Sequence, residues 1–302
     1  MDEHILITGA TGMLGKDLIA SLLYSGYRVS VLVRKPQQIK DVNVYLWDVD
    51  QQEIDTNCLT GVDSIIHMAG ENISSEKWSP ARKKKIIDSR VLSTALLYHA
   101  IATTKNQVKH FISASAVGYY GNRAEDILSE DSIAGNDFLA DCCVQWENAV
   151  DKGKSQGLRV VKIRTGVVLS KEGGALPAMS APVKWFAGAA LGSGKQWMPW
   201  IHHKDMTAIY IHALENTEMT GAYNACAPFP VTNATLTKAI AKKLHRPVWP
   251  FNVPEKVMKL ILGEMSAIVL NSTNTTAQRL LDTGFIFDYT LLDNALSDIY
   301  GQ

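Results

Sequence analysis

Residues 5–18 read ILITGATGMLGKDL, and this stretch decides the fold. A short apolar run at residues 5–7 is typical of a buried strand, and three glycines follow it at a spacing of three. We expect Gly9 to permit a tight turn, Gly12 to let the backbone approach a pyrophosphate, and Gly15 to let a helix pack closely. That helix would point free N–H groups at the phosphates. An ordinary glycine-rich turn is the alternative, but the strand before and the helix after favour a dinucleotide-binding unit.

The residues after the second predicted strand indicate which dinucleotide binds. The apolar run at residues 29–33 follows the first helix and completes a strand–helix–strand unit. An acidic residue after such a strand binds the ribose 2′-hydroxyl of NAD, whereas this chain has Arg34 and Lys35. Two cations suit the 2′-phosphate of NADP, and a guanidinium can hold a phosphate through two hydrogen bonds. We therefore predict NADP as cofactor, although the same pair on a solvated loop would need no ligand.

The next two predicted strands end in residues that face the expected cofactor cleft. Asp48 ends the third, and it suits a contact to the adenine amino group and a turn equally well. Ala69 and Gly70 follow the fourth, where their small size permits a close approach to the cofactor. His67 lies within that strand, and a buried, hydrogen-bonded core histidine is the better interpretation.

Polar residues of later elements also point to this cleft. Arg90 lies near the inner face of a long predicted helix, where a guanidinium seeks an anion such as a pyrophosphate. Ser115 ends the fifth predicted strand, in the crevice where open α/β sheets bind their ligands. Tyr119 and Tyr120 follow it, and each is either an acid facing the crevice or a packed aromatic residue with a satisfied hydroxyl.

Composition excludes several classes of protein. In 302 residues, 30 Lys and Arg balance 30 Asp and Glu, so no basic field argues for nucleic acid or an anionic membrane. No apolar run reaches the roughly 18 residues of a membrane span. The four cysteines form no CxxC pair, so we expect reduced thiols and no metal site. The early glycine motif leaves no room for a signal peptide, and we expect a cytoplasmic monomer or homodimer.

The order of elements predicts an α/β fold with a Rossmann doubly wound parallel sheet and helices on both faces. We assign residues 1–169 to the nucleotide-binding domain. Residues 170–302, in which glycines and tryptophans cluster first, form a smaller C-terminal lobe on the substrate side.

Six motifs are distributed along the chain: TGATGMLG at 8–15, HMAG at 67–70, GENI at 70–73, SASAVGYYG at 113–121, RTG at 164–166 and PWIH at 199–202. Through them the chain resembles the extended short-chain dehydrogenase/reductase superfamily, of the NAD-dependent epimerase/dehydratase type. It is more similar still to an atypical epimerase-like branch whose C-terminal segment is a domain of unknown function. The resemblance implies that residues 205–226 return to the nucleotide domain, and that the second lobe helps to bind an unknown small polar substrate.

The same resemblance assigns roles to individual residues. Ser115 matches the catalytic serine of the superfamily. The NADP contacts that it implies are Gly9, Thr11, Gly12, Met13, Leu14, Gly15, Arg34, Lys35, Met68, Ala69 and Arg90.

One motif of active members is missing. They carry Tyr-x-x-x-Lys on the helix after the serine, where the lysine lowers the pKa of the tyrosine that acts as acid and base. Alignment on Glu147 places Leu139 and Cys143 at these two positions, and neither can do this work. Tyr119 and Tyr120 are the candidate replacements for the acid.

Two functions therefore remain open. One is an NADP(H)-dependent, epimerase-like oxidoreductase, and the other is a catalytically weak or inactive NADPH-binding sensor. Four residues of the second lobe are further candidates to reach the cleft: Lys195, Gln196, His202 and His203.

Overall fold

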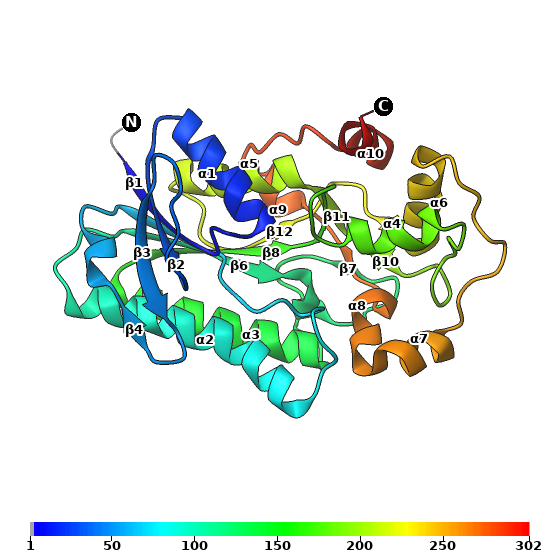
Figure 1. Ribbon diagram of the computed structural model, residues 1–302, viewed down its shortest axis with the longest axis horizontal. Coiled ribbons are helices and arrows are strands. Elements are labelled where there is room, and N and C mark those ends of the chain that lie inside the picture. Colours follow the sequence, from blue (N-terminus) through cyan, green and yellow to red (C-terminus); the bar gives the residue numbers. More distant parts are fainter. Residues whose placement is uncertain (1–2, 302) are drawn as a thin grey trace.

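The computed structural model of the chain describes residues 3–301, and an eight-stranded sheet forms its centre (Figure 1). Its strands are β1 (His4–Thr8), β2 (Arg28–Val33), β3 (Asn43–Asp48), β4 (Glu53–Ile54), β5 (Ser64–His67), β6 (His110–Ala116), β8 (Arg159–Thr165) and β12 (Gly221–Ala225). They lie in the order β12-β8-β6-β5-β1-β2-β3-β4, and only the β3–β4 pairing is antiparallel. The chain runs outward from β1 through β2 and β3, then returns to β5 on the other side. This order confirms the predicted doubly wound sheet.

Helices cover both faces of the sheet, as predicted (Figure 1). On one face lie α1 (Met13–Tyr24) and α5 (His203–Glu215), and on the other lie α2 (Pro80–Thr103) and α3 (Phe138–Asp151). Alternate side chains of β6 enter two separate cores: Ile112 packs in the cluster of α1 and α5, and Phe111 in that of α2 and α3. All five residues of β1 are buried, as expected of a parallel strand covered on both sides.

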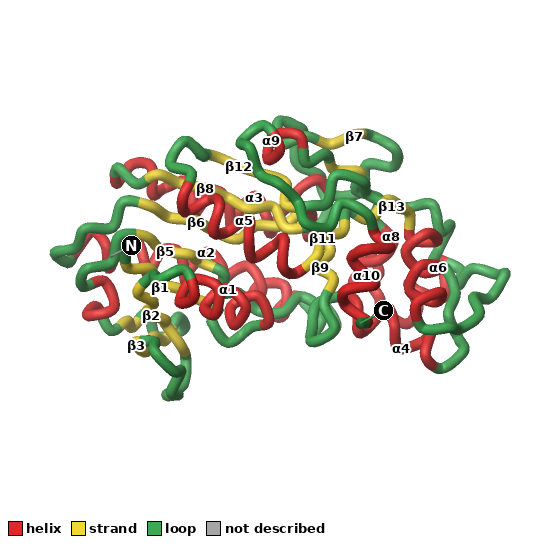
Figure 2. Tube along the Cα trace, turned by 90° about the horizontal axis from the view of Figure 1, so that it is seen from above, coloured by secondary structure: helices red, strands yellow, loops and turns green. Residues whose placement is uncertain are grey.

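The later part of the chain adds a group of helices at one end of the sheet (Figure 2). A third core, which includes Trp200, Leu236 and Leu296, joins these helices. Two elements of this half belong to the Rossmann part instead. Strand β12 joins the main sheet by pairing with β8, and helix α5 packs beside α1 on one face of it. The domain boundary at residue 169 stays a prediction.

The remaining elements complete the chain. The helices are α4 (Leu176–Lys184), α6 (Asn233–Lys243), α7 (Glu255–Leu262), α8 (Ala267–Leu270), α9 (Gln278–Leu281) and α10 (Leu292–Tyr300). Short 3₁₀ helices are η1 (Thr56–Leu59), η2 (Val117–Tyr120), η3 (Lys152–Gln156) and η4 (Gly263–Ser266). Three strand pairs lie outside the main sheet: β9 (Val167–Leu169) with β11 (Trp200–His202), β10 (Trp197–Met198) with β13 (Val231–Thr232), and β7 (Ile127–Leu128) with β14 (Asn274–Thr275).

Candidate functional site

The turn between β1 and α1 is too tight for side chains at two of its glycines. Gly9 has a left-handed backbone (φ +73°), and a Cβ there would lie 2.7 Å from the carbonyl carbon of Met68. A Cβ on Gly15 would lie 2.5 Å from the carbonyl oxygen of Gly9, so the helix closes directly onto the turn. Gly12 is the N-cap of α1 and has no side-chain cap. The N–H groups of the first turn are therefore open to an anion.

The other residues of the turn differ in exposure, and Ala10 is buried. Thr11 is exposed, and Met13 and Leu14 are half-buried. A Cβ on Gly173 would lie 3.4 Å from Sδ of Met13, so a loop from the second half of the chain lies beside the glycine turn.

His67 is a core residue with a fixed hydrogen-bond pattern, as predicted. Oγ1 of Thr8 accepts from the backbone N–H groups of Met68 and Ala69, at 3.2 and 3.1 Å, so its own proton goes to Nδ1 of His67, 2.7 Å away. Nε2 of the histidine then donates to Oγ of Ser93 at 3.1 Å. Burial lowers the pKa of His67 to about 3. The neutral ring joins β1, β5 and α2 next to the glycine turn.

Arg90 lies against the loop that follows β5. Its guanidinium donates to the backbone oxygens of Ile86 and Glu71, at 2.8 and 3.1 Å, and lies 5.0 Å from the ring of Trp146. A Cβ on Gly70 would come within 3.1 Å of Cζ of Arg90, so the small residue makes room for it. The expected inner position of Arg90 is observed, while its contact with a pyrophosphate stays a prediction.

The residues at the ends of β2 and β3 are exposed. Arg34 and Lys35 both reach solvent, and Nη1 of Arg34 lies 3.2 Å from Oε1 of Glu71. Asp48 accepts from the backbone N–H groups of Asp50 and Gln51, at 2.9 and 3.0 Å, which is the turn-forming role. Its contact with an adenine remains untested.

Ser115 is part of a buried ionic network. Its Oγ donates to Oε1 of Glu147 at 2.7 Å, and Arg164 donates to both oxygens of that carboxylate, at 2.8 and 3.0 Å. Burial alone would raise the pKa of Glu147, but hydrogen bonds and charge from Arg164 lower it. The hydroxyl proton of Ser115 is therefore used in the hydrogen bond to Glu147. In this arrangement the serine oxygen can accept a hydrogen bond from a ligand but not donate one. Arg164 lies in β8, which also carries Arg159 and Lys162, so the sequence alone did not single it out as a partner in this network.

The two tyrosines after Ser115 differ in environment. Tyr120 is fully buried, and its hydroxyl donates to Asn224 at 2.7 Å and accepts from Arg164 at 2.9 Å. Burial raises its pKa to about 12. These contacts favour the packed-aromatic interpretation for Tyr120. The ring of Tyr119 stacks on Arg164 with Cζ 3.6 Å from its centre, and within residues 3–301 its hydroxyl has no hydrogen-bond partner.

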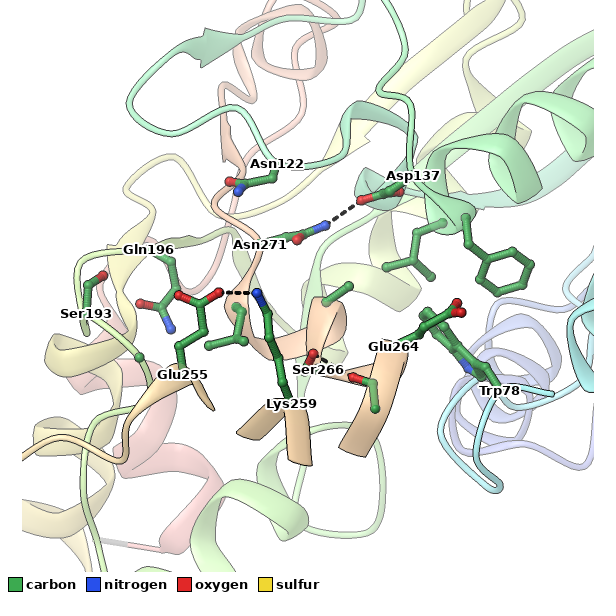
Figure 3. A pocket seen from close by; sticks show the side chains of 16 residues that line it. Trp78, Asn122, Asp137, Ser193, Gln196, Glu255, Lys259, Glu264, Ser266 and Asn271 are labelled. Atoms are coloured by element: carbon green, nitrogen blue, oxygen red, sulfur yellow. Dashed lines mark hydrogen bonds and ion pairs between the residues drawn. The ribbon is translucent and has the colours of Figure 1, made fainter. Parts of the chain in front are cut away.

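A cavity of about 600 Å³ lies between the start of α3 and residues 255–271 (Figure 3). Leu139 lines it, and a Cβ on Gly118 would lie 3.4 Å from Cβ of Leu139, which connects the cavity to the loop after Ser115. Burial raises the pKa of Cys143 and keeps the thiol neutral. Of the lining residues, the sequence pointed only to Leu139 and Gln196 as residues near the substrate. The others come from segments that lie far apart in the sequence. The polar lining residues that it missed are Asn122, Asp137, Ser193, Glu255, Lys259, Glu264, Ser266 and Asn271.

His202 and His203 lie at the start of α5 and do not line this cavity. Nδ1 of His202 accepts from the backbone of Lys204 at 3.2 Å, its ring stacks on Tyr289, and burial lowers its pKa to about 4. The two histidines and Asp298 offer three possible metal ligands within 4.8 Å of one another. The ammonium of Lys204 already lies 2.9 Å from both oxygens of Asp298, so ion pairs account for this cluster.

A parallel doubly wound sheet with a glycine turn after its first strand defines a dinucleotide-binding Rossmann protein. The chain belongs to the NAD dependent epimerase/dehydratase family, whose model matches residues 5–226. Residues 253–299 match a domain of unknown function, DUF1731. Both matches confirm the resemblance seen in the sequence.

Several known proteins are similar over nearly the whole chain. An epimerase family protein of Mycobacterium leprae is 34% identical over 295 residues, 97% of this chain and 94% of its own. The chloroplastic epimerase family protein SDR39U1 homolog of Arabidopsis thaliana is 36% identical over 301 residues, 98% of this chain and 86% of its own. The crystal structure of human epimerase family protein SDR39U1 (isoform 2) with NADPH has a TM-score of 0.87 at 29% identity and covers 99% of both chains. A nucleoside-diphosphate sugar epimerase structure from Corynebacterium glutamicum has a TM-score of 0.81 at 34% identity, over 100% of this chain and 59% of its own.

Two further expectations concern where the protein acts. Among the helices of residues 3–301, none is long and apolar enough to cross a bilayer. One relative is named chloroplastic, so the expected cytoplasmic location stays a prediction.

Proposed function

We propose that the chain is an NADP(H)-binding, epimerase-like oxidoreductase that acts on a small molecule in the cavity beside Leu139. The observation that carries the choice of NADP(H) is the exposed pair Arg34 and Lys35 at the end of β2, where an NAD enzyme has an acidic residue. The human relative whose structure contains NADPH supports the same choice.

The residues of the cleft suit such a cofactor. The glycine turn leaves a cradle that a side chain would fill, and the uncapped start of α1 faces it. Glu71 lies beside Arg34, but Arg82 already neutralises it at 2.8 Å, so Arg34 can exchange Glu71 for a phosphate. The bound cofactor would supply hydride chemistry. The oxygen of Ser115 would accept a hydrogen bond from the substrate. The hydroxyl of Tyr119 would carry the proton that the substrate gains or loses.

Titration of tryptophan fluorescence with NADPH and NADH tests the cofactor choice. We expect NADPH to bind more tightly, and Arg34→Ala to remove about 10- to 100-fold of that preference, the strength of one or two charged hydrogen bonds. Lys105→Ala is the control, because Lys105 is exposed and precedes the amino end of β6, whereas Arg34 follows the carboxyl end of β2. Equal affinities for the two cofactors, unchanged in Arg34→Ala, would refute the NADP assignment.

The second candidate function is an NADPH-binding sensor with little or no turnover. The apolar Leu139 and the neutral, buried Cys143 favour it, since neither replaces the usual tyrosine and lysine. A metabolite screen that follows NADPH absorbance distinguishes the two: turnover of any member supports the oxidoreductase. Because one relative is named a nucleoside-diphosphate sugar epimerase, the screen includes sugar nucleotides among other polar metabolites.

A further inference from the structure

The charges around the cavity beside Leu139 bear on what it can bind. Its lining carboxylates are Asp137, Glu255 and Glu264, and within the described residues Lys259 is the single cation of the lining. Nζ of Lys259 lies 2.6 Å from Oε1 of Glu255 (Figure 3). Glu264 forms an ion pair with Lys83 of α2. Every ammonium group at this cavity is therefore already matched by a carboxylate, and one carboxylate remains in excess.

Two helices point their positive ends at the cavity, and both carry an acid there. Asp137 caps α3, where Oδ1 accepts from the backbone N–H of Ala140 at 2.9 Å and Oδ2 accepts from Asn271 at 2.7 Å. Glu255 is the first residue of α7 and lines the cavity. Asp137 occupies the place where α3 would otherwise bind a phosphate, whereas Glu255 pairs with Lys259 and adds a negative charge at the start of α7. Among the described lining residues, an anionic ligand would therefore meet no cation without a carboxylate partner. It would meet a capped start of α3, and a start of α7 that has no side-chain cap but carries the acid Glu255.

The wall beside α3 is apolar. The rings of Trp78 and Phe138 pack edge to face with 4.7 Å between their centres, and Leu139 and Leu270 line the cavity as well. The indole N–H of Trp78 is bound to the backbone oxygen of Ile73 at 2.8 Å, so its ring offers apolar surface to a ligand. The resemblance to the superfamily places Leu139 at the position of the usual tyrosine. An apolar group of the ligand is therefore favoured on this side.

We propose that the substrate of this site is an uncharged or cationic small molecule with an apolar part, and that nucleoside diphosphates are excluded. This inference rests on the proposed function, since it names the substrate class of the same NADP(H) site. Figure 3 shows Asn122 and Ser193 across the cavity from Trp78, with Asn271 between them, and these hydrogen-bonding residues would orient the polar part. A diphosphate would lose its hydration without gaining a cation.

The test uses the full chain saturated with NADPH and follows ligand binding by saturation-transfer NMR. Three benzaldehydes of similar shape serve as probes: 4-isopropylbenzaldehyde, the cationic 4-trimethylammonio compound and the anionic 4-carboxy compound. UDP-glucose is the fourth probe. We expect the neutral and cationic probes to bind, and the carboxylate and UDP-glucose to bind more weakly or not at all.

A double variant, Glu255→Gln with Glu264→Gln, tests the charge argument directly. These side chains are more than half exposed, which weakens their charge effect, so we expect the preference for the cationic over the anionic probe to fall only about threefold to tenfold. Glu218→Gln is the matched control, because Glu218 is exposed in the turn between α5 and β12 and does not line the cavity.

Several results would overturn this inference. They are binding of UDP-glucose or the carboxylate as tight as that of the cationic probe, no binding of either the neutral or the cationic probe, and an unchanged preference in the double variant. An NADPH titration of the same samples keeps the two proposals apart. Failure to bind NADPH would count against the proposed function, whereas the charge preference of the cavity is measured separately.

Discussion

Gly9 and Gly26 both have a left-handed backbone, but only Gly9 is enclosed. Their φ angles are +73° and +83°, and a Cβ on Gly26 would meet nothing within 4 Å. We predict that Gly26→Ala costs the conformational strain alone, about 1–2 kcal/mol. Gly9→Ala adds a clash with the backbone of Met68, so it should cost more and abolish NADPH binding. Urea unfolding and cofactor titration measure both effects, and equal losses of stability in the two variants would contradict the packing argument.

His67 should make stability depend on pH. The pKa of His67 is about 3 in the folded chain, against 6.5 for an ordinary histidine. Between these values the unfolded state binds one more proton, so stability is fully present above pH 6.5 and falls as pH falls toward 3. We predict a loss of about 1.4 kcal/mol per pH unit from this group below pH 6.

The control for this pH dependence is a variant without the titrating ring. His67→Gln should be less stable at neutral pH, because Thr8 and Ser93 lose a partner. Its free energy of unfolding should fall less steeply between pH 6.5 and 5, by about one proton. An unchanged slope would show that another group carries the effect.

At the residue scale, sequence patterns predicted what local context determines. An apolar strand around His67 was enough to predict a core histidine, and the glycine spacing was enough to predict the turn. The partners of Ser115 were not predictable, because Glu147 and Arg164 come from other elements. The same holds for the cavity, whose lining extends from Trp78 to Asn271 along the chain.

At the scale of elements, α6 and α7 differ in how firmly they are held. Five residues of α6 are buried, whereas α7 has none, and its Leu260 and Ile261 are exposed. A helix without buried contacts opens at low free-energy cost. We predict that amide hydrogens of residues 255–262 exchange faster than those of 233–243 in hydrogen-exchange mass spectrometry, and that a cavity ligand slows them because Glu255 and Lys259 line the cavity.

The concentration dependence of this exchange is the control. If protection of α7 rises with protein concentration while α6 is unchanged, a second copy covers its apolar face, which would favour the homodimer over the monomer. Protection of α7 equal to that of α6 at every concentration would contradict the prediction.

At the scale of the molecule, two elements from the second half of the chain, α5 and β12, lie among the elements of the first half. The strand pattern and the βαβ chirality made the parallel strands β1, β2, β3, β5, β6 and β8 predictable, whereas the short antiparallel β4 was not predicted. The pairing of β12 with β8 was harder to predict from sequence, because the segment that forms α4 and the loops around it separates the two strands. Long-range pairings of this kind depend on packing that no local pattern encodes.

These contacts between the two halves of the chain predict which fragments fold cooperatively. Residues 1–169 lack β12 and α5, so they expose the sheet face that Met206, Ile209 and Tyr210 cover. Each of these buried side chains contributes about 1.5–3 kcal/mol, and a domain's net stability is only about 5–15 kcal/mol. We predict that fragment 1–169 shows no cooperative thermal transition by circular dichroism, that fragment 1–226 regains one, and that the full chain is the most stable. A fragment 1–169 that unfolds cooperatively and binds NADPH would show that the first half is an independent domain after all.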